Sequence, residues 1–361
     1  MRTIISKTYF LISVIAAALT LTSCGPRDRY ISFSGYAQGG IYTVKLNMNG
    51  RNGMIKEKPD EIQRKVDSIL TAVDNSLSGY NKKSLLSRFN SGEAITPDSL
   101  FIDLYKRGYQ LYYETTGIID VASGPLFNLW GFGFKSGEMP DDHVVAETLM
   151  TCGVDRLTED FQAAIGTDNL IYGTDILKTG ITDKTSPVLN YNAIAQGYSC
   201  DLVAEYLYGI GVKDMLVDIG EIFCDGLNPS GGPWSLGIDK PIDGNNELGA
   251  QIQGIFRAPA GPHGIVTSGN YRKFYVRDGK KYAHTIDPRT GYPVKHNLLS
   301  ATIVAENAIT ADAYATYCMV VGLEEAKNLL ERREDLEGCF IYDENGEFRT
   351  WCSEGFTLEE L

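Results

Sequence analysis

Residues 309–322 read "ITADAYATYCMVVG", a largely apolar stretch that carries an acid, Asp312, and the hydroxyl of Thr316 among its small residues. Asp312 and Thr316 stand four positions apart, so on a helix both side chains lie on one face. Their oxygen atoms are donors of the kind that Mg²⁺ prefers. Two structural explanations of Asp312 and Thr316 compete with metal binding. An Asp in the first turn of a helix interacts favourably with the helix dipole, and a helical Thr can bond to the carbonyl four residues earlier.

The stretch belongs to a longer helical region, and the segments before it set the fold class. Apolar spacing predicts helices over residues 59–76, 98–116, 193–211 and 310–333, the last with a break near Gly322. Residues 42–48, 338–344 and several short segments between 214 and 305 are typical of strands. Helices and antiparallel-looking strands mix without strict alternation, which favours an α+β fold over a doubly wound parallel sheet.

The N-terminus is typical of a secretory signal. Arg2 and Lys7 precede an apolar run at 9–21, which is short for a transmembrane helix. The sequence "LTSC" at 21–24 resembles a bacterial lipobox, so we expect Cys24 to be lipidated; an ordinary signal with an incidental cysteine is the alternative. We predict a signal at 1–23, a tether at 24–33 and one domain at 34–361. The protein is then exported and lipid-anchored to a bacterial membrane, facing the periplasm.

Composition excludes two classes of function. The net charge is −13, or −15 without the two basic residues of the signal, so nucleic acid is a poor partner. The chain has only four histidines and no C-x-x-C pair, which argues against a structural zinc site. One disulfide is possible in an exported protein, but the sequence does not assign it. Beyond Cys24, six cysteines are scattered along the chain: Cys152, Cys200, Cys224, Cys318, Cys339 and Cys352.

Two segments carry further candidates for chemistry. In "YAHTIDPRTGYPVKHN" (282–297), His284 stands three residues before Asp287 and is a candidate base near neutral pH. A histidine bonded inside a loop is the alternative. In "GIVTSGNYRKFY" (264–275), Thr267 and Ser268 offer hydroxyls and open backbone N–H groups that can hold phosphate. An ordinary hairpin connection explains that pattern equally well.

Two more segments can contact a ligand. Small residues open the predicted helix in "NYNAIAQGYSCD" (190–201) and allow a ligand to approach the backbone. In "TTGIIDVASGPLFNLWGFG" (115–133), Asp120 is one acid in an apolar, aromatic setting. Asp120 is either a local cap or a hydrogen-bonding partner for the polar edge of a flat aromatic ligand.

The combination and order of these motifs resemble the ApbE family, the FAD:protein FMN transferases, across nearly all of the chain after the signal. The matching positions are Gly117, Asp120, Gly124, Pro125, Leu126, Leu129, Trp130, Gly131 and Phe132; Ala193, Ile194, Ala195, Gly197, Tyr198 and Asp201; 267–271; His284, Ile286, Asp287, Pro288, Thr290, Gly291 and Pro293; and Ala311, Asp312, Ala313 and Thr316. The resemblance implies one α+β, T-fold-like domain with a largely antiparallel sheet.

The resemblance also implies roles. Asp312 and Thr316 are expected to bind Mg²⁺ through their side chains, and Ala193 through its backbone oxygen. His284, with Asp287, is the expected catalytic group. The expected FAD-contacting positions are Gln38, Tyr80, Ile118, Ile119, Asp120, Asn190, Gln196, Thr267, Ser268 and Ile286. The chain departs from the family at four positions. Gln38 stands where Met is common, and Asn190 stands where Asp is common. Gln196 replaces a common Lys or Glu, and Glu221 replaces the usual Gly.

The implied reaction is Mg²⁺-dependent transfer of FMN from FAD, the substrate, to a Thr or Ser hydroxyl, with release of AMP. The acceptor would be an exported or membrane flavoprotein, such as a subunit of a membrane redox pump. Two alternatives remain. An Mg²⁺-dependent FAD pyrophosphatase would use water in place of the acceptor. A non-catalytic FAD-binding lipoprotein is compatible with the departures at Asn190 and Gln196.

Overall fold

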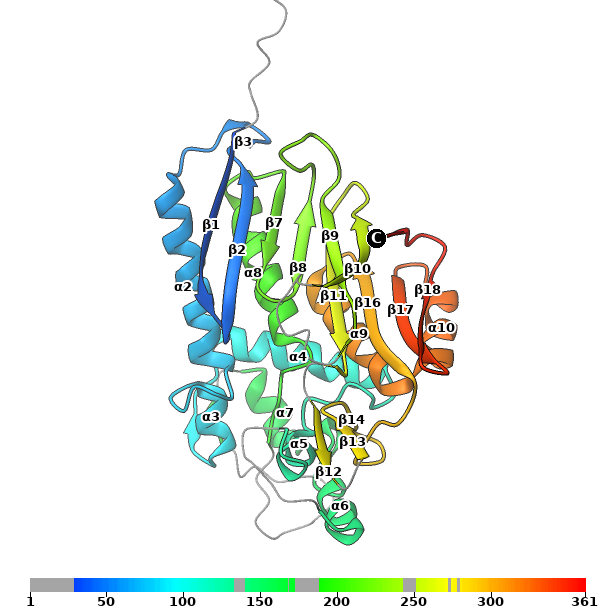
Figure 1. Cartoon of the computed structure of the whole chain (residues 1–361). Coiled ribbons are helices and arrows are strands. Elements are labelled where there is room, and N and C mark those ends of the chain that lie inside the picture. Colours follow the sequence, from blue (N-terminus) through cyan, green and yellow to red (C-terminus); the bar gives the residue numbers. More distant parts are fainter. Residues whose placement is uncertain are drawn as a thin grey trace, which may run out of the picture.

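An eight-stranded sheet forms the centre of the computed structural model, which describes residues 29–132, 140–167, 169–172, 188–242, 251–271, 274–277 and 280–361 (Figure 1). Every neighbouring pair of strands in this sheet is antiparallel. In spatial order the strands are β1 (Tyr30–Ala37), β2 (Gly40–Asn47), β7 (Met215–Asp218), β8 (Ile222–Asp225), β11 (His263–Gly269), β16 (Leu298–Ala305), β17 (Glu337–Glu344) and β18 (Glu347–Cys352). The predicted α+β class with an antiparallel sheet is confirmed.

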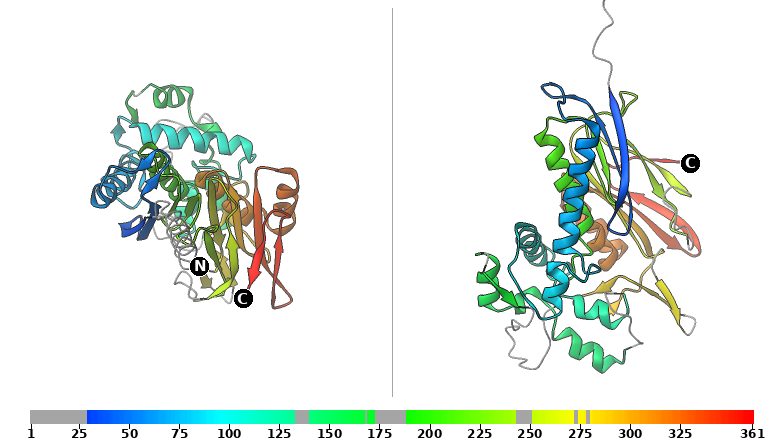
Figure 2. Two further views of the ribbon diagram at one scale, coloured as in Figure 1. Left: turned by 90° about the horizontal axis from the view of Figure 1, so that it is seen from above. Right: turned by 90° about the vertical axis from the view of Figure 1, so that its left-hand side faces the viewer.

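Four helices cover one face of this sheet (Figure 2). They are α2 (Pro59–Leu77), α8 (Ala195–Gly209), α9 (Ala308–Val321) and α10 (Leu323–Arg332). Side chains alternate across a strand, so Ile303 of β16 packs on the helical side while its neighbour Val304 packs on the other side. The helix α9 lies against β11, β16 and α8, and it is buried on almost every side.

A smaller antiparallel sheet packs on the opposite face of the main sheet. Its strands are β9 (Ser235–Asp239), β10 (Ile252–Arg257) and β19 (Leu358–Glu360), with β10 in the middle. An apolar layer between the two sheets contains Trp234, Phe256 and Phe356, and the last two rings stack with centroids 4.2 Å apart. The central strands are therefore buried on both faces.

A second lobe of short helices and hairpins lies at one end of the sheet, below it in Figure 1. Its elements are α3 (Leu85–Asn90), α4 (Ser99–Glu114), α5 (Gly124–Leu129), α6 (Asp142–Leu149), η1 (Val154–Arg156), α7 (Glu159–Ile165), and the strand pairs β5 (Ala94–Ile95) with β6 (Ile171–Tyr172), β12 (Phe274–Arg277) with β13 (Lys280–Ala283) and β14 (Ile286–Asp287) with β15 (Tyr292–Pro293). The hairpin of β3 (Asn49–Gly50) and β4 (Gly53–Met54) lies at the other end of the sheet.

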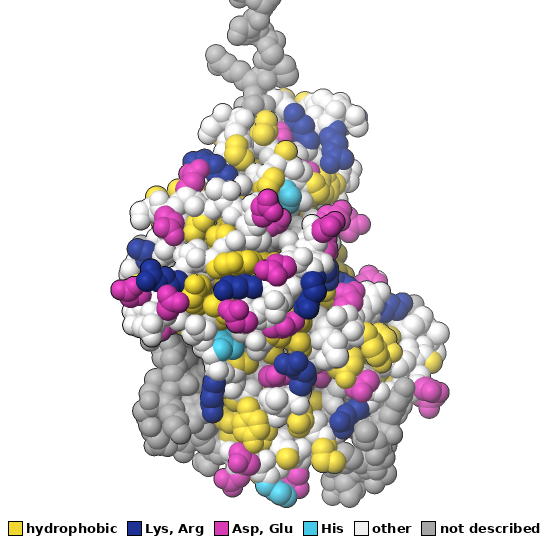
Figure 3. All heavy atoms as spheres, turned by 90° about the vertical axis from the view of Figure 1, so that its right-hand side faces the viewer, with side chains coloured by type: hydrophobic (Ala, Val, Ile, Leu, Met, Phe, Trp, Pro, Cys, Tyr) yellow, Lys and Arg dark blue, Asp and Glu magenta, His cyan; other side chains and the backbone are white. Residues whose placement is uncertain are grey.

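The surface over α10 and the β17–β18 hairpin mixes acidic and basic side chains with small apolar areas (Figure 3). Several of these charges form exposed ion pairs, including Arg332 with Glu325 and Arg349 with Glu344. Exposed pairs of this kind contribute at most about 1 kcal/mol each. This face is a solvated surface that carries no concentration of one charge.

The predicted helices and the break at Gly322 are confirmed, and Gly322 adopts φ +82° between α9 and α10. The predicted tether is too long, because β1 begins at Tyr30 and pairs with β2 from Tyr30↔Asn47 onward. The polar residues of "YISFSGYA" concealed this strand, since β1 is an edge strand whose alternate residues face solvent. The predicted signal and Cys24 lie outside the described residues. Within the described ranges, no helix is long and apolar enough to cross a membrane.

Candidate active site

The beginning of α9 is held by side chains from its own cap and from α8. Asn307 caps the helix, its side-chain oxygen accepting the Thr310 backbone N–H at 2.9 Å. The two carboxylate oxygens of Asp201, on α8, accept the N–H groups of Ala308 and Ile309 at 2.8 and 2.9 Å. These are donors that a helix start leaves without an intrahelical partner. The position of α9 along α8 is therefore fixed by charge-assisted hydrogen bonds.

Two glycines let α9 approach its neighbours backbone to backbone. A Cβ atom on Gly197 of α8 would lie 2.4 Å from the carbonyl oxygen of Ala308. A Cβ atom on Gly264 of β11 would lie 2.3 Å from the carbonyl carbon of Asn307. Both distances are shorter than real contacts, so only glycine fits at either position.

Asp312 lies at this close contact. Its side chain is 4% exposed, and Oδ2 accepts the backbone N–H of Gly197 at 3.0 Å. Burial is the main reason that the pKa of Asp312 is raised to about 8; the hydrogen bond from Gly197 opposes this shift and the nearby Asp201 adds to it. The helix-dipole explanation does not apply, because α9 starts at Ala308 and has no acid in its first turn. Asp312 instead presents a carboxylate to the junction of α8 and α9.

The donors around Asp312 fit a hard divalent cation. Thr316 is half-buried one turn further along α9, and Ala193 is half-buried just before α8. A carboxylate, a hydroxyl and a backbone carbonyl together offer the oxygen donors that Mg²⁺ takes. In the described part of the chain, no group of three or more His, Cys, Asp or Glu is arranged to hold a metal. The expected Mg²⁺ ligands stay a prediction, which the buried carboxylate of Asp312 supports.

The loop before α8 joins three of the expected FAD-contacting segments. The Asn192 side-chain amide donates to the Tyr80 hydroxyl at 3.3 Å, and the Asn192 backbone N–H donates to Asn190 Oδ1 at 2.9 Å. The Asn190 backbone N–H then donates to the carbonyl of Val121 at 2.8 Å. Tyr80 is 63% exposed, so its ring is accessible to a flat ligand next to the loop before α8.

Asp120 lies at the buried end of this arrangement. It is 9% exposed, and Oδ1 accepts the Ala122 backbone N–H at 2.9 Å. Burial raises the pKa of Asp120 to about 7. Ile118 and Ile119 next to it are buried in the main core, and Ile286 is buried in a smaller cluster with Leu126 and Trp130. The side chains of these isoleucines pack inside the protein, which leaves their backbone for any contact with a ligand.

The pKa of Asp120 makes a prediction about stability. An ordinary aspartate has a pKa of 3.8, so between about pH 4 and pH 7 the folded protein holds a proton that the unfolded chain does not. The stability from this group is complete below about pH 4 and is lost as the pH rises through 7. Asp120→Asn, which keeps the acceptor for Ala122, should therefore gain stability relative to wild type as the pH rises from about 5 to 8. Melting temperatures of both proteins across this range test this, and a constant difference contradicts it.

Four further expected FAD-contacting residues lie around α8 and β11. Gln38, in the β1–β2 turn, donates to Ser199 Oγ at 2.5 Å, and Gln196 donates to the carbonyl of Ile219 at 3.0 Å. Thr267 Oγ1 lies 2.8 Å from Thr302 Oγ1 on β16, and Ser268 is half-buried beside it. Gln38 and Gln196 thus tie two turns to the start of α8, which gives these departures from the family pattern a structural role.

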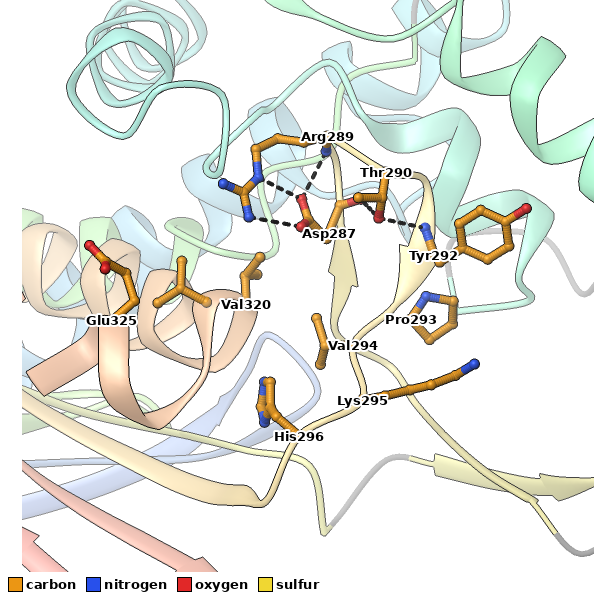
Figure 4. A pocket seen from close by; sticks show the side chains of 11 residues that line it. Asp287, Arg289, Thr290, Tyr292, Pro293, Val294, Lys295, His296, Val320 and Glu325 are labelled. Atoms are coloured by element: carbon orange, nitrogen blue, oxygen red, sulfur yellow. Dashed lines mark hydrogen bonds and ion pairs between the residues drawn. The ribbon is translucent and has the colours of Figure 1, made fainter.

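The structure gives Asp287 a role in a turn. Both of its carboxylate oxygens pair with the Arg289 guanidinium, at 3.0 and 2.9 Å (Figure 4). The carbonyl of Asp287 accepts the backbone N–H groups of Thr290 and Gly291. This turn borders an open hollow of about 570 Å³ that extends to Val320 at the end of α9 and to Glu325. His284 is half-buried three residues earlier, with its ring edge-on to Phe132 at 6.5 Å between centroids. Because Arg289 occupies the carboxylate of Asp287, His284 is the better candidate for a catalytic base.

Sequence reasoning assigned no role to several residues that build this site. Asp201 and Gly197 stood only as matched motif positions, although their spacing of four places both on one face of α8. Asn192, Gly264 and Arg289 carried no signal, since their partners are distant in the sequence or belong to a turn whose geometry was not predicted. Asp201, Gly197, Asn192, Gly264 and Arg289 hold in place the residues that are expected to bind Mg²⁺ and FAD.

The fold is α+β, and the candidate site lies where the main sheet, its helical layer and the second lobe meet. The model of the ApbE family matches residues 39–340. Relatives named FAD:protein FMN transferase include one from Haemophilus influenzae, 33% identical over 353 residues with 96% of each chain covered. Another is from Escherichia coli K12, 33% identical over 359 residues, covering 96% of this chain and 95% of the relative.

Solved structures agree with these matches. The flavinyl transferase ApbE of Pseudomonas stutzeri, in its apo form, superimposes with a TM-score of 0.74 at 31% identity, covering 91% of this chain and 95% of that one. The flavin transferase ApbE of Vibrio cholerae gives a TM-score of 0.71 at 30% identity, covering 91% and 98%. The chain belongs to the ApbE family. The resemblance expected from its motifs is confirmed.

Proposed function

We propose that this protein transfers FMN from FAD to a Thr or Ser hydroxyl of an exported or membrane flavoprotein, releases AMP and requires Mg²⁺. The coarser statement, a flavin transferase of the ApbE family, has the support of the relatives named above. The observation that carries the finer proposal is the buried carboxylate of Asp312. It accepts a hydrogen bond from Gly197 at the α8–α9 junction, and Asn192 in the loop before α8 bonds to the exposed Tyr80.

Each part of the site has a function in this reaction. Tyr80 would stack on the flavin, and Asp120 would bond a polar group at the edge of a flat ring. Asp312, Thr316 and the carbonyl of Ala193 would hold Mg²⁺, which supplies positive charge to the FAD pyrophosphate and to the leaving AMP. The acceptor oxygen forms a new bond to the phosphorus on the flavin side, and the bond from that phosphorus to the bridging oxygen breaks. His284 would take the hydroxyl proton.

A kinetic experiment separates this reaction from hydrolysis and from binding alone. The protein is incubated with FAD and Mg²⁺, with an exported acceptor domain that carries a candidate threonine, or with its Thr→Ala variant. We expect AMP release to accelerate only with the threonine acceptor, and a flavin-fluorescent acceptor band to appear at the same rate. Equal AMP release with both acceptors would identify a pyrophosphatase. Bound FAD without AMP release would identify a binding protein.

The proposed location makes a separate prediction. We propose that the protein is exported and anchored through lipid on Cys24, on the periplasmic side of a bacterial membrane, where exported acceptors would meet it. Lipid anchoring depends on the burial of acyl chains, at about 0.8 kcal/mol per methylene. In cells producing the full chain, wild type should fractionate with membranes and incorporate labelled fatty acid, and Cys24→Ser should do neither. Labelling of Cys24→Ser at the wild-type level would contradict lipidation at this residue.

A further inference from the structure

Two cysteines lie directly opposite each other at the edge of the main sheet. Cys339 of β17 pairs in register with Cys352 of β18. In the next pair along, the Ser353 N–H donates to the carbonyl of Gly338 at 2.9 Å, which makes Cys339 and Cys352 a non-hydrogen-bonded pair. In such pairs the two Cα atoms are about 4.5 Å apart. Disulfides span Cα separations from about 4.4 Å upward, so a cross-link here requires no movement of the strands.

The side chains of Cys339 and Cys352 point at each other, and Cys352 is accessible from solvent. The Cys352 thiol donates to the Cys339 sulfur with 2.7 Å between the sulfurs. Cys339 is buried and Cys352 is partly exposed, so an oxidant can approach through Cys352. The other cysteines of the described chain, Cys152, Cys200, Cys224 and Cys318, are all buried. The thiols of Cys152 and Cys200 bond to backbone carbonyls.

We propose that Cys339 and Cys352 are a redox-active pair that forms an intrachain disulfide by exchange with a disulfide-bearing oxidant, a class that includes the oxidised thiol proteins of exporting compartments. The Cys352 thiolate attacks one sulfur of the oxidant and releases its first thiol. The Cys339 thiolate then attacks Cys352 Sγ in the mixed disulfide and releases the second. One sulfur–sulfur bond forms in the protein and one breaks in the oxidant, and the two protons of the protein thiols pass to the released thiols.

The bond would fasten the C-terminal part of the chain. The strand β18 is the last in the main sheet, and the residues after it cross to the smaller sheet, where β19 pairs with β10 and Phe356 stacks on Phe256. Cys339 lies in the apolar layer between the two sheets, on the face away from α9 and Asp312. Oxidation would therefore change the resistance of the C-terminus to proteolysis and leave flavin transfer unchanged.

Peptide mapping tests the pair in the full chain. Trypsin cleavage after Arg333 and Arg349 separates Cys339, in 334–349, from Cys352, in 350–361. The protein is treated with oxidised glutathione, free thiols are alkylated in denaturant, and the digest is analysed without reduction. We expect these two peptides joined, and separate after reduction. Of the six cysteines in the described chain, four should be alkylated before reduction and all six after it.

Variants show whether the pairing is specific. Cys224→Ala removes a buried cysteine from the same layer between the sheets and should keep the joined peptides. Cys352→Ser should leave Cys339 alkylated and should transfer flavin at the wild-type rate, with faster carboxypeptidase trimming than the oxidised wild type. Both peptides recovered separately and alkylated from the oxidised wild type would overturn the proposal. Glutathione found on Cys352 alone would also overturn it.

Discussion

Asp312→Asn should lower Mg²⁺-dependent flavin transfer by about three orders of magnitude, because a metal contributes several kcal/mol to charge stabilisation and each 1.4 kcal/mol is roughly tenfold in rate. The amide keeps the size of the side chain and an oxygen for the Gly197 N–H, so the fold should persist. It removes the charge that a cation needs. The measurement is the initial rate of acceptor flavinylation across a range of Mg²⁺ concentrations.

Asp103→Asn is the matched control, since Asp103 is an exposed acid on α4. This variant should keep the wild-type rate and the wild-type dependence on Mg²⁺. Calorimetry with Mg²⁺ and FAD gives a second readout, in which Asp312→Asn should lose the metal-dependent part of the binding signal. A wild-type rate and Mg²⁺ dependence in Asp312→Asn would rule out Asp312 as the metal ligand.

Gly197→Ala should destabilise the protein by about 2–3 kcal/mol, because the new methyl group would collide with the backbone of α9. Relief of this contact must move α8 away from Ala308, and the hydrogen bond to Asp312 would lengthen with it. We therefore expect a lower free energy of unfolding together with weaker Mg²⁺ dependence of transfer. Urea denaturation and the flavinylation assay measure the two effects.

The same helix supplies a control with the opposite sign. Gly209 is at the end of α8, and a Cβ atom there would meet nothing within 4 Å. Gly209→Ala should be neutral or should stabilise the protein by up to about 1 kcal/mol, since alanine loses less backbone entropy than glycine in a helix. If both variants were equally stable, the close contact of α8 with α9 would not be what holds Asp312 in place.

The helices were predictable because the apolar spacing and the capping residues of a helix both lie within one continuous segment. The cap at Asp98, for example, is visible in the sequence and accepts the N–H of Phe101 three residues later. The strand β1 was missed, since an edge strand with polar alternate residues resembles a tether. The small sheet of β9, β10 and β19 depends on pairing between residues about a hundred positions apart, such as Phe256 and Leu358, which periodicity does not reveal.

The sequence predicted those site residues that belong to a recognisable motif. It was less informative where a residue's role depends on its neighbours in the folded protein. The spacing of Asp312 and Thr316 predicted that both lie on one face of a helix, and the family resemblance implied that they bind Mg²⁺. The same resemblance joined Asp287 to His284, but Arg289 lies against both carboxylate oxygens of Asp287. The raised pKa of Asp120 comes from burial that only the fold creates.

The most direct test of the proposed transfer is the intact mass of an acceptor domain after incubation with this protein, FAD and Mg²⁺. We predict that the acceptor gains the mass of one FMN phosphoester at a single Thr or Ser, and that the gain disappears when Mg²⁺ is chelated or Asp312 is replaced by Asn. An acceptor of unchanged mass, while FAD is converted to FMN and AMP at the same rate with or without it, would contradict flavin transfer.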